Sequence, residues 1–178
     1  MAKLLQIAQL GHPILRKKAK AVEIIQDNYL QQLIDNLIAT VIDINGVGIA
    51  APQVYESYQI FIIASHPNPR YPDTPKMEPE VIIQPKIISH SDEVIKDWEG
   101  CLSIPGIRGL VPRYKSINVE YLARDGEKKE KEFTNFIARI FQHEYDHLNG
   151  LVFLDRLENV KDIITDKEYQ KLIIQNEK

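Results

Sequence analysis

Residues 134–150 read TNFIARIFQHEYDHLNG, and this stretch decides the fold that we expect. Its apolar residues recur every three or four positions, which is the spacing of one face of an α-helix. Thr134 is a residue type that favours the start of a helix, and Gly150 is a common stop just beyond the last turn. We therefore expect a helix with one shared side formed by Ile137, Ile140, Phe141, Glu144 and Leu148.

The expected helix carries the pattern H-E-x-x-H at His143-Glu144-Tyr145-Asp146-His147. A spacing of four puts both imidazoles on one face, one turn apart, so they can bind a single divalent cation. Glu144 can take a proton from a water at that cation and deliver it to a leaving group. A carboxylate on the apolar side of a helix is costly without a partner, and a metal site would supply one. The alternative is a fortuitous match.

Two histidines do not complete a catalytic site, because such sites use three protein ligands. The metzincin pattern would place a histidine where Phe153 stands, and Glu158 and Glu168 fit the glutamate of thermolysin-like sites only loosely. Cys101 is the better third ligand, since a thiolate binds borderline metals well. On spacing alone, however, a structural role for Cys101 is the favoured interpretation, because a lone cysteine is most often a small buried hydrophobe.

Two further helices flank this one in the sequence. The apolar spacing of residues 27–44 predicts the first, with Asp27 or Asn28 as its cap. Thr165 and Glu168 form a capping box that predicts the second, at the end of the chain.

Strands are expected between these helices, at residues 58–64, 81–88, 116–123 and 127–132. Pro85 confines the second of these strands to an edge or a bulge, and the charged fourth strand is suited to an edge. Residues 66–80 hold five of the ten prolines and are expected to form a surface loop. The pattern indicates an α+β fold, with antiparallel β-sheets surrounding a central helix that carries HExxH, an N-terminal helix and a C-terminal helix.

Length and composition place these elements in a single domain spanning residues 1–178. The hydrophobic fraction of 44% supports one core, and the net charge of -3 argues against a strongly basic surface, so we expect no direct DNA binding. A single cysteine excludes an intramolecular disulfide and suits a reducing compartment. We see no signal peptide and no apolar run long enough for a membrane. We therefore expect a bacterial-type cytoplasmic protein, or an organellar matrix protein if a transit peptide was removed.

Three segments occur in fixed order along the chain: Gly46-Val47-Gly48-Ile49-Ala50-Ala51-Pro52-Gln53, Glu99-Gly100-Cys101-Leu102-Ser103 and Gln142-His143-Glu144-Tyr145-Asp146-His147-Leu148. Together they resemble the motifs of the peptide deformylase family. With Pro13 to Arg16 and Val111 to Arg113, the resemblance covers roughly Gly11 to Asp155, most of the chain.

The resemblance implies a metal-dependent hydrolase that removes the N-terminal formyl group from formyl-methionyl peptides of newly made proteins and releases formate. Cys101, His143 and His147 would hold the metal ion, and a metal-bound water would attack the formyl carbon. Glu144 would act as general acid and base. The backbone N–H of Leu102 and the side-chain amide of Gln53 would donate hydrogen bonds to the oxyanion.

The resemblance also implies a substrate-binding region. Its candidate residues are Gly46, Val47, Gly48, Glu99, Gly100, Arg108, Phe136 and Ile140. The glycines let a backbone approach closely, and a peptide can pair there as an added strand. Val47, Phe136 and Ile140 are candidates for the methionine pocket. Similar proteins suggest that Glu99 and Arg113 form a buried pair, and two separate surface charges are the alternative.

The family implies one divalent metal ion, iron(II) in most members, although Zn2+, Ni2+ or Co2+ can occupy such sites. The expected partners are N-formylmethionyl nascent peptides and, near its exit tunnel, the ribosome.

Two other functions share parts of the pattern. An HExxH zinc metalloprotease would need a different third ligand, and a metal-stabilised binding module would need a closed site with a fourth.

Overall fold

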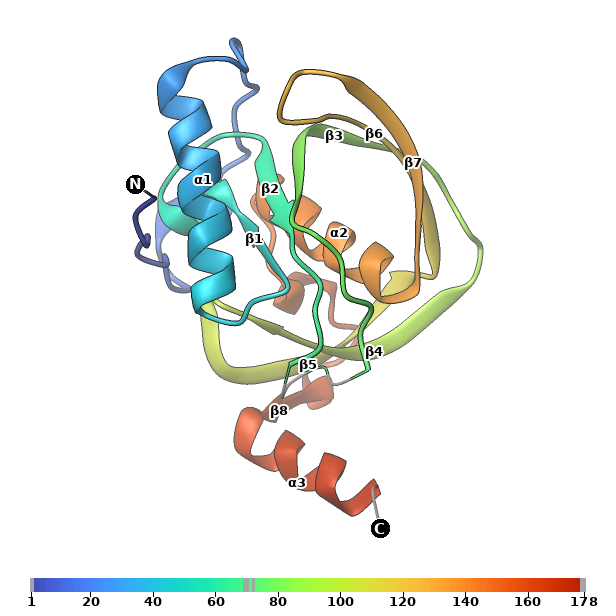
Figure 1. Cartoon of the computed structure of the whole chain (residues 1–178). Helices are drawn as coiled ribbons and strands as arrows, with labels where there is room; N and C mark the ends of the chain where they lie inside the picture. The colour runs from blue at the N-terminus through green and yellow to red at the C-terminus, as the bar shows by residue number, and fades with distance from the viewer. Residues whose placement is uncertain (1, 69–70, 72, 177–178) are drawn as a thin grey trace.

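The structure is a computed structural model that describes residues 2–68, 71 and 73–176. Five strands form one antiparallel sheet in the order β1-β2-β3-β6-β7 (Figure 1). Their bounds are β1 (Gly48–Ala50), β2 (Ile60–Ile63), β3 (Glu80–His90), β6 (Ser116–Leu122) and β7 (Lys128–Thr134). The four strands expected from the sequence correspond to β2, β3, β6 and β7, and β7 is an edge strand, as its charges predicted.

Strand β3 pairs with β2 on one side and with β6 on the other, so it is not an edge strand. Its proline is accommodated by a bulge: Ile83 pairs with Leu122 and Lys86 with Glu120, which leaves one extra residue on β3. Gln84 adopts a positive φ of 50° within this bulge. Of the two placements that Pro85 allowed, the bulge is the one that occurs.

A second sheet has the order β4-β5-β8, with β4 (Val94–Cys101), β5 (Ile104–Tyr114) and β8 (Ile163–Thr165). Strands β4 and β5 form a long hairpin that was not expected. The first half of β4 is exposed, and glycine and proline interrupt β5, so neither strand shows a clean alternating pattern. The hairpin matters because Cys101 ends β4 at the turn.

Helix α1 (Asn28–Asp43) confirms the helix expected at residues 27–44. The Asp27 carboxylate accepts hydrogen bonds from the backbone N–H groups of Tyr29 (3.0 Å) and Leu30 (3.2 Å). These two donors would otherwise be unpaired in the first turn. The apolar face of α1 packs on β1 and β2.

Helix α2 (Asn135–Leu148) contains the H-E-x-x-H residues and packs against strands of both sheets. Figure 1 shows it framed by β3, β6 and β7 above and by β4 and β5 below. Thr134 is its N-cap residue, as predicted, and the chain leaves the helix through Gly150, which has a φ of +74°. A side chain at position 150 would also clash with the backbone of Arg16, whose carbonyl carbon lies 2.8 Å from the Cβ position.

Helix α3 (Asp166–Asn176) follows β8 and projects from the body of the molecule (Figure 1). The backbone N–H of Glu168 donates to the Thr165 hydroxyl at 3.3 Å, which confirms Thr165 as the cap. The described residues between β2 and β3 form a loop with a single bridge between Asn68 and Tyr71, as the prolines predicted. Within the described part of the chain, no helix has the length and apolarity needed to cross a membrane.

Candidate active site

Helix α2 and the end of β4 bring Cys101, His143 and His147 together. Their ligand atoms all lie within 4.8 Å of one another, and Cys101 Sγ is 3.3 Å from His147 Nε2. His147 is fully buried, and Cys101 is half-buried. The H-E-x-x-H spacing therefore brings the two imidazoles together, as predicted. The unexpected β4–β5 hairpin supplies the thiol.

The three side chains fit a divalent cation. Burial, together with the charge of His143, lowers the pKa of His147 well below its ordinary value, and a neutral imidazole is the form that binds a metal. Its Nδ1 atom is buried and has no hydrogen-bond partner among the described residues. Two imidazoles and one thiolate suit zinc, iron, cobalt or nickel.

A buried carboxylate orients the first histidine. His143 donates a hydrogen bond from Nδ1 to Glu99 Oε2 at 2.9 Å, so its other nitrogen, Nε2, is left for the ligand cluster. Such a carboxylate fixes the tautomer and orientation of a metal-binding imidazole. Glu99, which was expected near the substrate, therefore also supports a metal ligand.

Two arginines hold Glu99 in place. Arg113 donates to both of its oxygens, at 2.8 and 3.0 Å, and to Asp146 at 2.6 Å. Arg139 donates to Glu99 Oε1 at 2.8 Å. All four side chains are buried, which confirms the predicted Glu99–Arg113 pair. Burial alone would raise the pKa of Glu99, but Arg113 and His143 hold it well below its usual range.

Arg139 was missed in the sequence, and it joins the helix to the hairpin. Besides Glu99, it donates to the backbone carbonyl oxygens of Ile95 (2.6 Å) and Val111 (2.9 Å). Its side chain is 8% exposed. The only signal was its position, one helical turn before His143, since a charged residue there must face the same neighbours as the histidine.

Gln53 points its amide at the thiol from the opposite wall of the site. Its Oε1 accepts a hydrogen bond from the backbone of Ala50 at 2.8 Å. Its Nε2 lies 3.5 Å from Cys101 Sγ and 3.3 Å from the Ser103 hydroxyl. The side chain is almost fully buried, so these contacts fix its orientation.

Glu144 is buried beside the cluster, and its Oε2 has no hydrogen-bond partner among the described residues. Burial raises its pKa to about 7. Gly48 on β1 makes room for this carboxylate, because a Cβ there would come within 2.5 Å of Glu144 Oε1 and 2.9 Å of Ile140. The H-E-x-x-H motif on α2 and the glycine motif at residues 46–53 therefore contact each other through Glu144 and Gly48.

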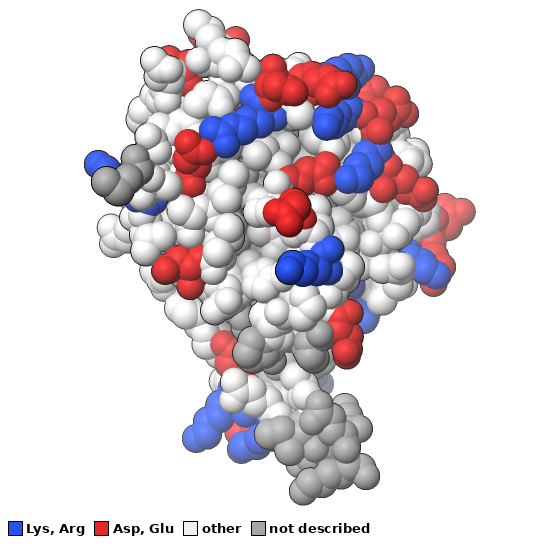
Figure 2. All heavy atoms as spheres, in the orientation of Figure 1, with Lys and Arg blue, Asp and Glu red and all other residues white. Residues whose placement is uncertain are grey.

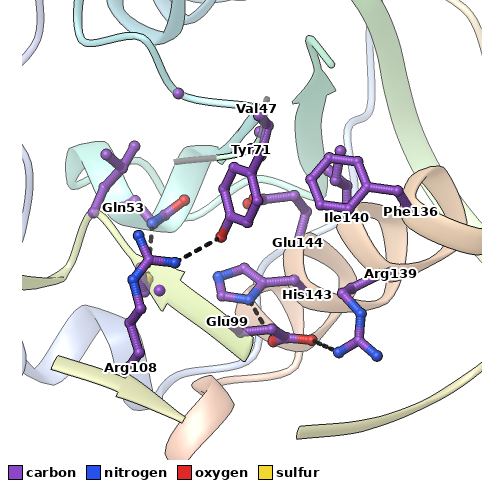
Figure 3. Close-up of a pocket in the computed structure, with 15 residues that line it drawn as sticks. Val47, Gln53, Tyr71, Glu99, Arg108, Phe136, Arg139, Ile140, His143 and Glu144 are labelled. Atoms are coloured by element: carbon purple, nitrogen blue, oxygen red, sulfur yellow. Dashed lines mark hydrogen bonds and ion pairs between the residues drawn. The ribbon is translucent and has the colours of Figure 1, made fainter. Parts of the chain in front are cut away.

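These residues surround one cavity (Figure 3). Every predicted site residue except His147 lines it, and His147 joins from the buried side through its contact with Cys101. The predicted residues that line it are Gly46, Val47, Gly48, Gln53, Glu99, Gly100, Cys101, Leu102, Arg108, Phe136, Ile140, His143 and Glu144. Arg139 and Tyr71 line it too and were not predicted.

Tyr71 comes from the proline-rich loop between β2 and β3. Its ring lies 5.0 Å from that of Phe136, and its hydroxyl is 3.5 Å from Arg108 Nη1. Figure 3 shows Tyr71 and Arg108 pointing toward one another at the cavity. A single aromatic residue in a proline-rich loop was the only signal in the sequence.

The residues that the alternative functions would need lie elsewhere. Glu158 pairs with Lys96 at 2.5 Å and Glu168 with Lys171 at 2.7 Å, away from the ligand cluster. Phe153, at the metzincin histidine position, stacks on His143 with ring centroids 6.2 Å apart. In the described part of the chain, the cluster has three members, which suits an open catalytic site and not a closed four-ligand one.

Comparisons with known proteins agree with this site. A sequence model of the family "Polypeptide deformylase" matches residues 4–162. The chain is similar to peptide deformylase 2 of Nostoc sp., at 59% identity over 98% of each chain. It is also similar to peptide deformylase 2 of Shewanella oneidensis, at 47% identity over 85% of this chain and 83% of that one.

Among solved structures, the chain resembles a class I type b peptide deformylase from Acinetobacter baumannii with Met-Ala-Ser bound. The TM-score is 0.86 and the identity 47%, with coverage of 88% of this chain and all of the other. The chain therefore belongs to the polypeptide deformylase family, enzymes that remove N-terminal formyl groups in a metal-dependent hydrolysis.

Proposed function

We propose that this chain hydrolyses the formyl group from the N-terminal methionine of new proteins, with the roles of its residues as follows. The observation that carries the proposal is the meeting of Cys101, His143 and His147 with Glu144 and Gln53 at one cavity. It unites a three-ligand set, a buried carboxylate and an amide donor. This is the set that acyl hydrolysis at a metal requires.

Cys101, His143 and His147 would hold the cation, which we propose to be iron(II), with Zn2+, Ni2+ or Co2+ as alternatives. When bound, it supplies Lewis-acid activation of a water and of the formyl oxygen. Glu99 keeps His143 in the tautomer that leaves Nε2 for the cation. Arg113 keeps Glu99 ionised, and Arg139 helps to hold it in place.

Glu144 would move the proton. Its carboxylate lies in the cavity wall one residue from a ligand, and its raised pKa suits a group that both accepts and releases a proton near neutral pH. It would accept the proton of the attacking water and pass it to the departing amine. The products would be formate and a free α-amino group.

Gln53 and the backbone N–H of Leu102 would donate to the oxygen that gains negative charge. The Gln53 amide already points at Cys101, and Leu102 follows Cys101 at the β4–β5 turn. Donors fixed in advance at such a position are typically worth about 3 kcal/mol each.

The peptide would lie along β1. This strand is an edge of the large sheet, so its outer side is open to pairing with an extended peptide next to Gly46, Val47 and Gly48. Phe136 and Ile140 with Val47 would form the apolar surface for the methionine side chain. Arg108 would bind peptide oxygens beyond the methionine. The Acinetobacter baumannii relative binds Met-Ala-Ser, the peptide left when formyl-Met-Ala-Ser loses its formyl group.

A product analysis tests this function against the protease alternative. Protein loaded with metal under anaerobic conditions is incubated with formyl-Met-Ala-Ser, and the products are identified by mass spectrometry. We expect formate and intact Met-Ala-Ser. Cleavage of a peptide bond would contradict the proposal and favour a protease. Ribosome docking and a cytoplasmic location remain predictions.

A further inference from the structure

Helix α3 reaches the active-site cavity through Arg108. Strand β8 pairs with the segment of β5 that carries this arginine, with Arg108 opposite Ile164 and Ile107 opposite Thr165. Helix α3 begins at the next residue, Asp166. The strand pairing thus places the first turn of α3 beside Arg108, which lines the cavity.

Two α3 side chains hold the guanidinium. Asp166 Oδ1 accepts a hydrogen bond from Arg108 Nε at 2.7 Å. The ring of Tyr169 lies under the guanidinium, with its centroid 4.4 Å from the guanidinium carbon. Arg108 is only 3% exposed, although Asp166 keeps 43% of its side chain accessible. Contacts of this kind fix a long side chain that would otherwise sample many rotamers.

The same guanidinium also contacts the loop between β2 and β3. The Tyr71 ring centroid is 5.6 Å from the guanidinium carbon, and its hydroxyl is 3.5 Å from Nη1. Tyr71 rests on Phe136 in the cavity wall. A guanidinium carries five N–H donors, and contacts with the described residues engage two of them, so Arg108 offers further donors to a ligand in the cavity.

The α3 contacts lie outside the part of the chain that the family model matches, which ends at residue 162. The cavity, by contrast, is lined wholly by residues within that part. Helix α3 thus follows the matched part of the chain and contacts one residue of its active site, Arg108. Trp98 of β4 supports it from beneath, with its ring 5.8 Å from that of Tyr169.

We propose that Asp166 and Tyr169 are positioning residues that hold Arg108 over the cavity to bind peptide oxygens beyond the formyl-methionine. The inference rests on the proposed function and names the part of the substrate that α3 governs. Helix α3 acts on affinity for the peptide and not on the chemical step, because Arg108 lines the cavity but belongs neither to the ligand cluster nor to the proton-transfer group, Glu144. It favours substrates with at least one residue after methionine.

The test compares two substrates in steady-state kinetics, formyl-Met-Ala-Ser and formyl-methionine amide, which lacks the downstream residues. For Asp166→Asn, we expect the KM for the tripeptide to rise about tenfold, the scale of a hydrogen bond to a charged group, while kcat holds. The KM for the amide should stay the same. Tyr169→Leu should act in the same direction and is the second variant if Asp166→Asn does not fold.

Lys167→Ala is the matched control, since Lys167 is the exposed neighbour of Asp166 on α3. It should leave both KM values unchanged. In an Arg108→Leu background, Asp166→Asn should add nothing, because its effect passes through Arg108. An unchanged tripeptide KM, an equal rise for both substrates, or additive effects would each overturn the inference.

Binding of the product peptide separates this inference from the proposed function. If wild type releases no formate, the proposed function fails, and calorimetry with Met-Ala-Ser still decides the role of α3. A weaker Kd in Asp166→Asn than in Lys167→Ala would support the positioning role. Equal Kd values would overturn it.

Discussion

Glycine at position 48 sets the room that Glu144 has beside the metal ligands. Gly48→Ala would place a methyl group 2.5 Å from Glu144 Oε1, so the carboxylate must move. Restoring an ordinary contact distance requires a shift of about 1 Å, and a misplacement of about 1 Å can cost roughly a hundredfold in rate. We expect kcat for formate release to fall on that scale while metal content is retained.

Gly100→Ala is the matched control for that change. It adds the same methyl group to the same cavity, where its nearest neighbour is Arg108 at 3.7 Å, an ordinary contact. We expect a much smaller loss of kcat. Equal losses in the two variants would show that the Gly48–Glu144 contact has no special role.

Arg139 ties His143 to the hairpin through Glu99. Arg139→Met keeps the length of the side chain but removes its donors to Glu99, Ile95 and Val111. Breaking such a buried pair costs about 3 kcal/mol, and loss of support for a metal ligand lowers metal affinity roughly tenfold. Urea unfolding and competition with a metal chelator measure the two effects. Wild-type values in both would refute this role.

At the scale of single elements, the cap of α1 offers a clean test. Asp27→Ala removes the acceptor for the N–H groups of Tyr29 and Leu30 and should lower the free energy of unfolding by about 1 kcal/mol. Asp43→Ala, at the exposed last residue of the same helix, is the control. It should be neutral or slightly stabilising, since a carboxylate there opposes the helix dipole. Equal losses in urea unfolding would contradict the capping role.

The elements that could be predicted are those whose periodicity is local. Helices α1 and α2 bury a regular apolar face, and the described ends of both agree closely with the sequence. The β4–β5 hairpin could not be predicted. Half of β4 is exposed, and the two strands are held mainly by pairing with each other, which no local sequence pattern reveals. Cys101 could still be identified although the hairpin was not predicted, because the motif around this residue resembles the family motif.

The site residues likewise divide into those that a local pattern marks and those that it does not. The metal ligands, Glu144 and Gln53 lie in short motifs whose spacing or resemblance marks them. Tyr71 and Arg139 reach the cavity only through tertiary packing, one from a loop and one through contacts with a hairpin that was not foreseen. No local pattern reports such contacts.

At the scale of the whole molecule, the cation would join α2 to the β4–β5 hairpin. The face shown in Figure 2 mixes acidic and basic side chains, so no broad field of one sign attracts or repels the cation there. Its binding energy should add directly to folding stability, by about 4 kcal/mol at a thousandfold excess over Kd. We expect chelation to lower the unfolding midpoint of wild type. Cys101→Ser should lose most of this difference, and a midpoint that does not respond to chelation would exclude the joining role.

The most direct test of the central claim is formate release by Glu144→Gln, with metal content measured in the same samples. This variant keeps the shape of the side chain beside Gly48 and removes its ability to move a proton. The account predicts that it binds metal as wild type does, folds normally, and releases almost no formate from formyl-Met-Ala-Ser. A metal-loaded Glu144→Gln that works at the wild-type rate would contradict it.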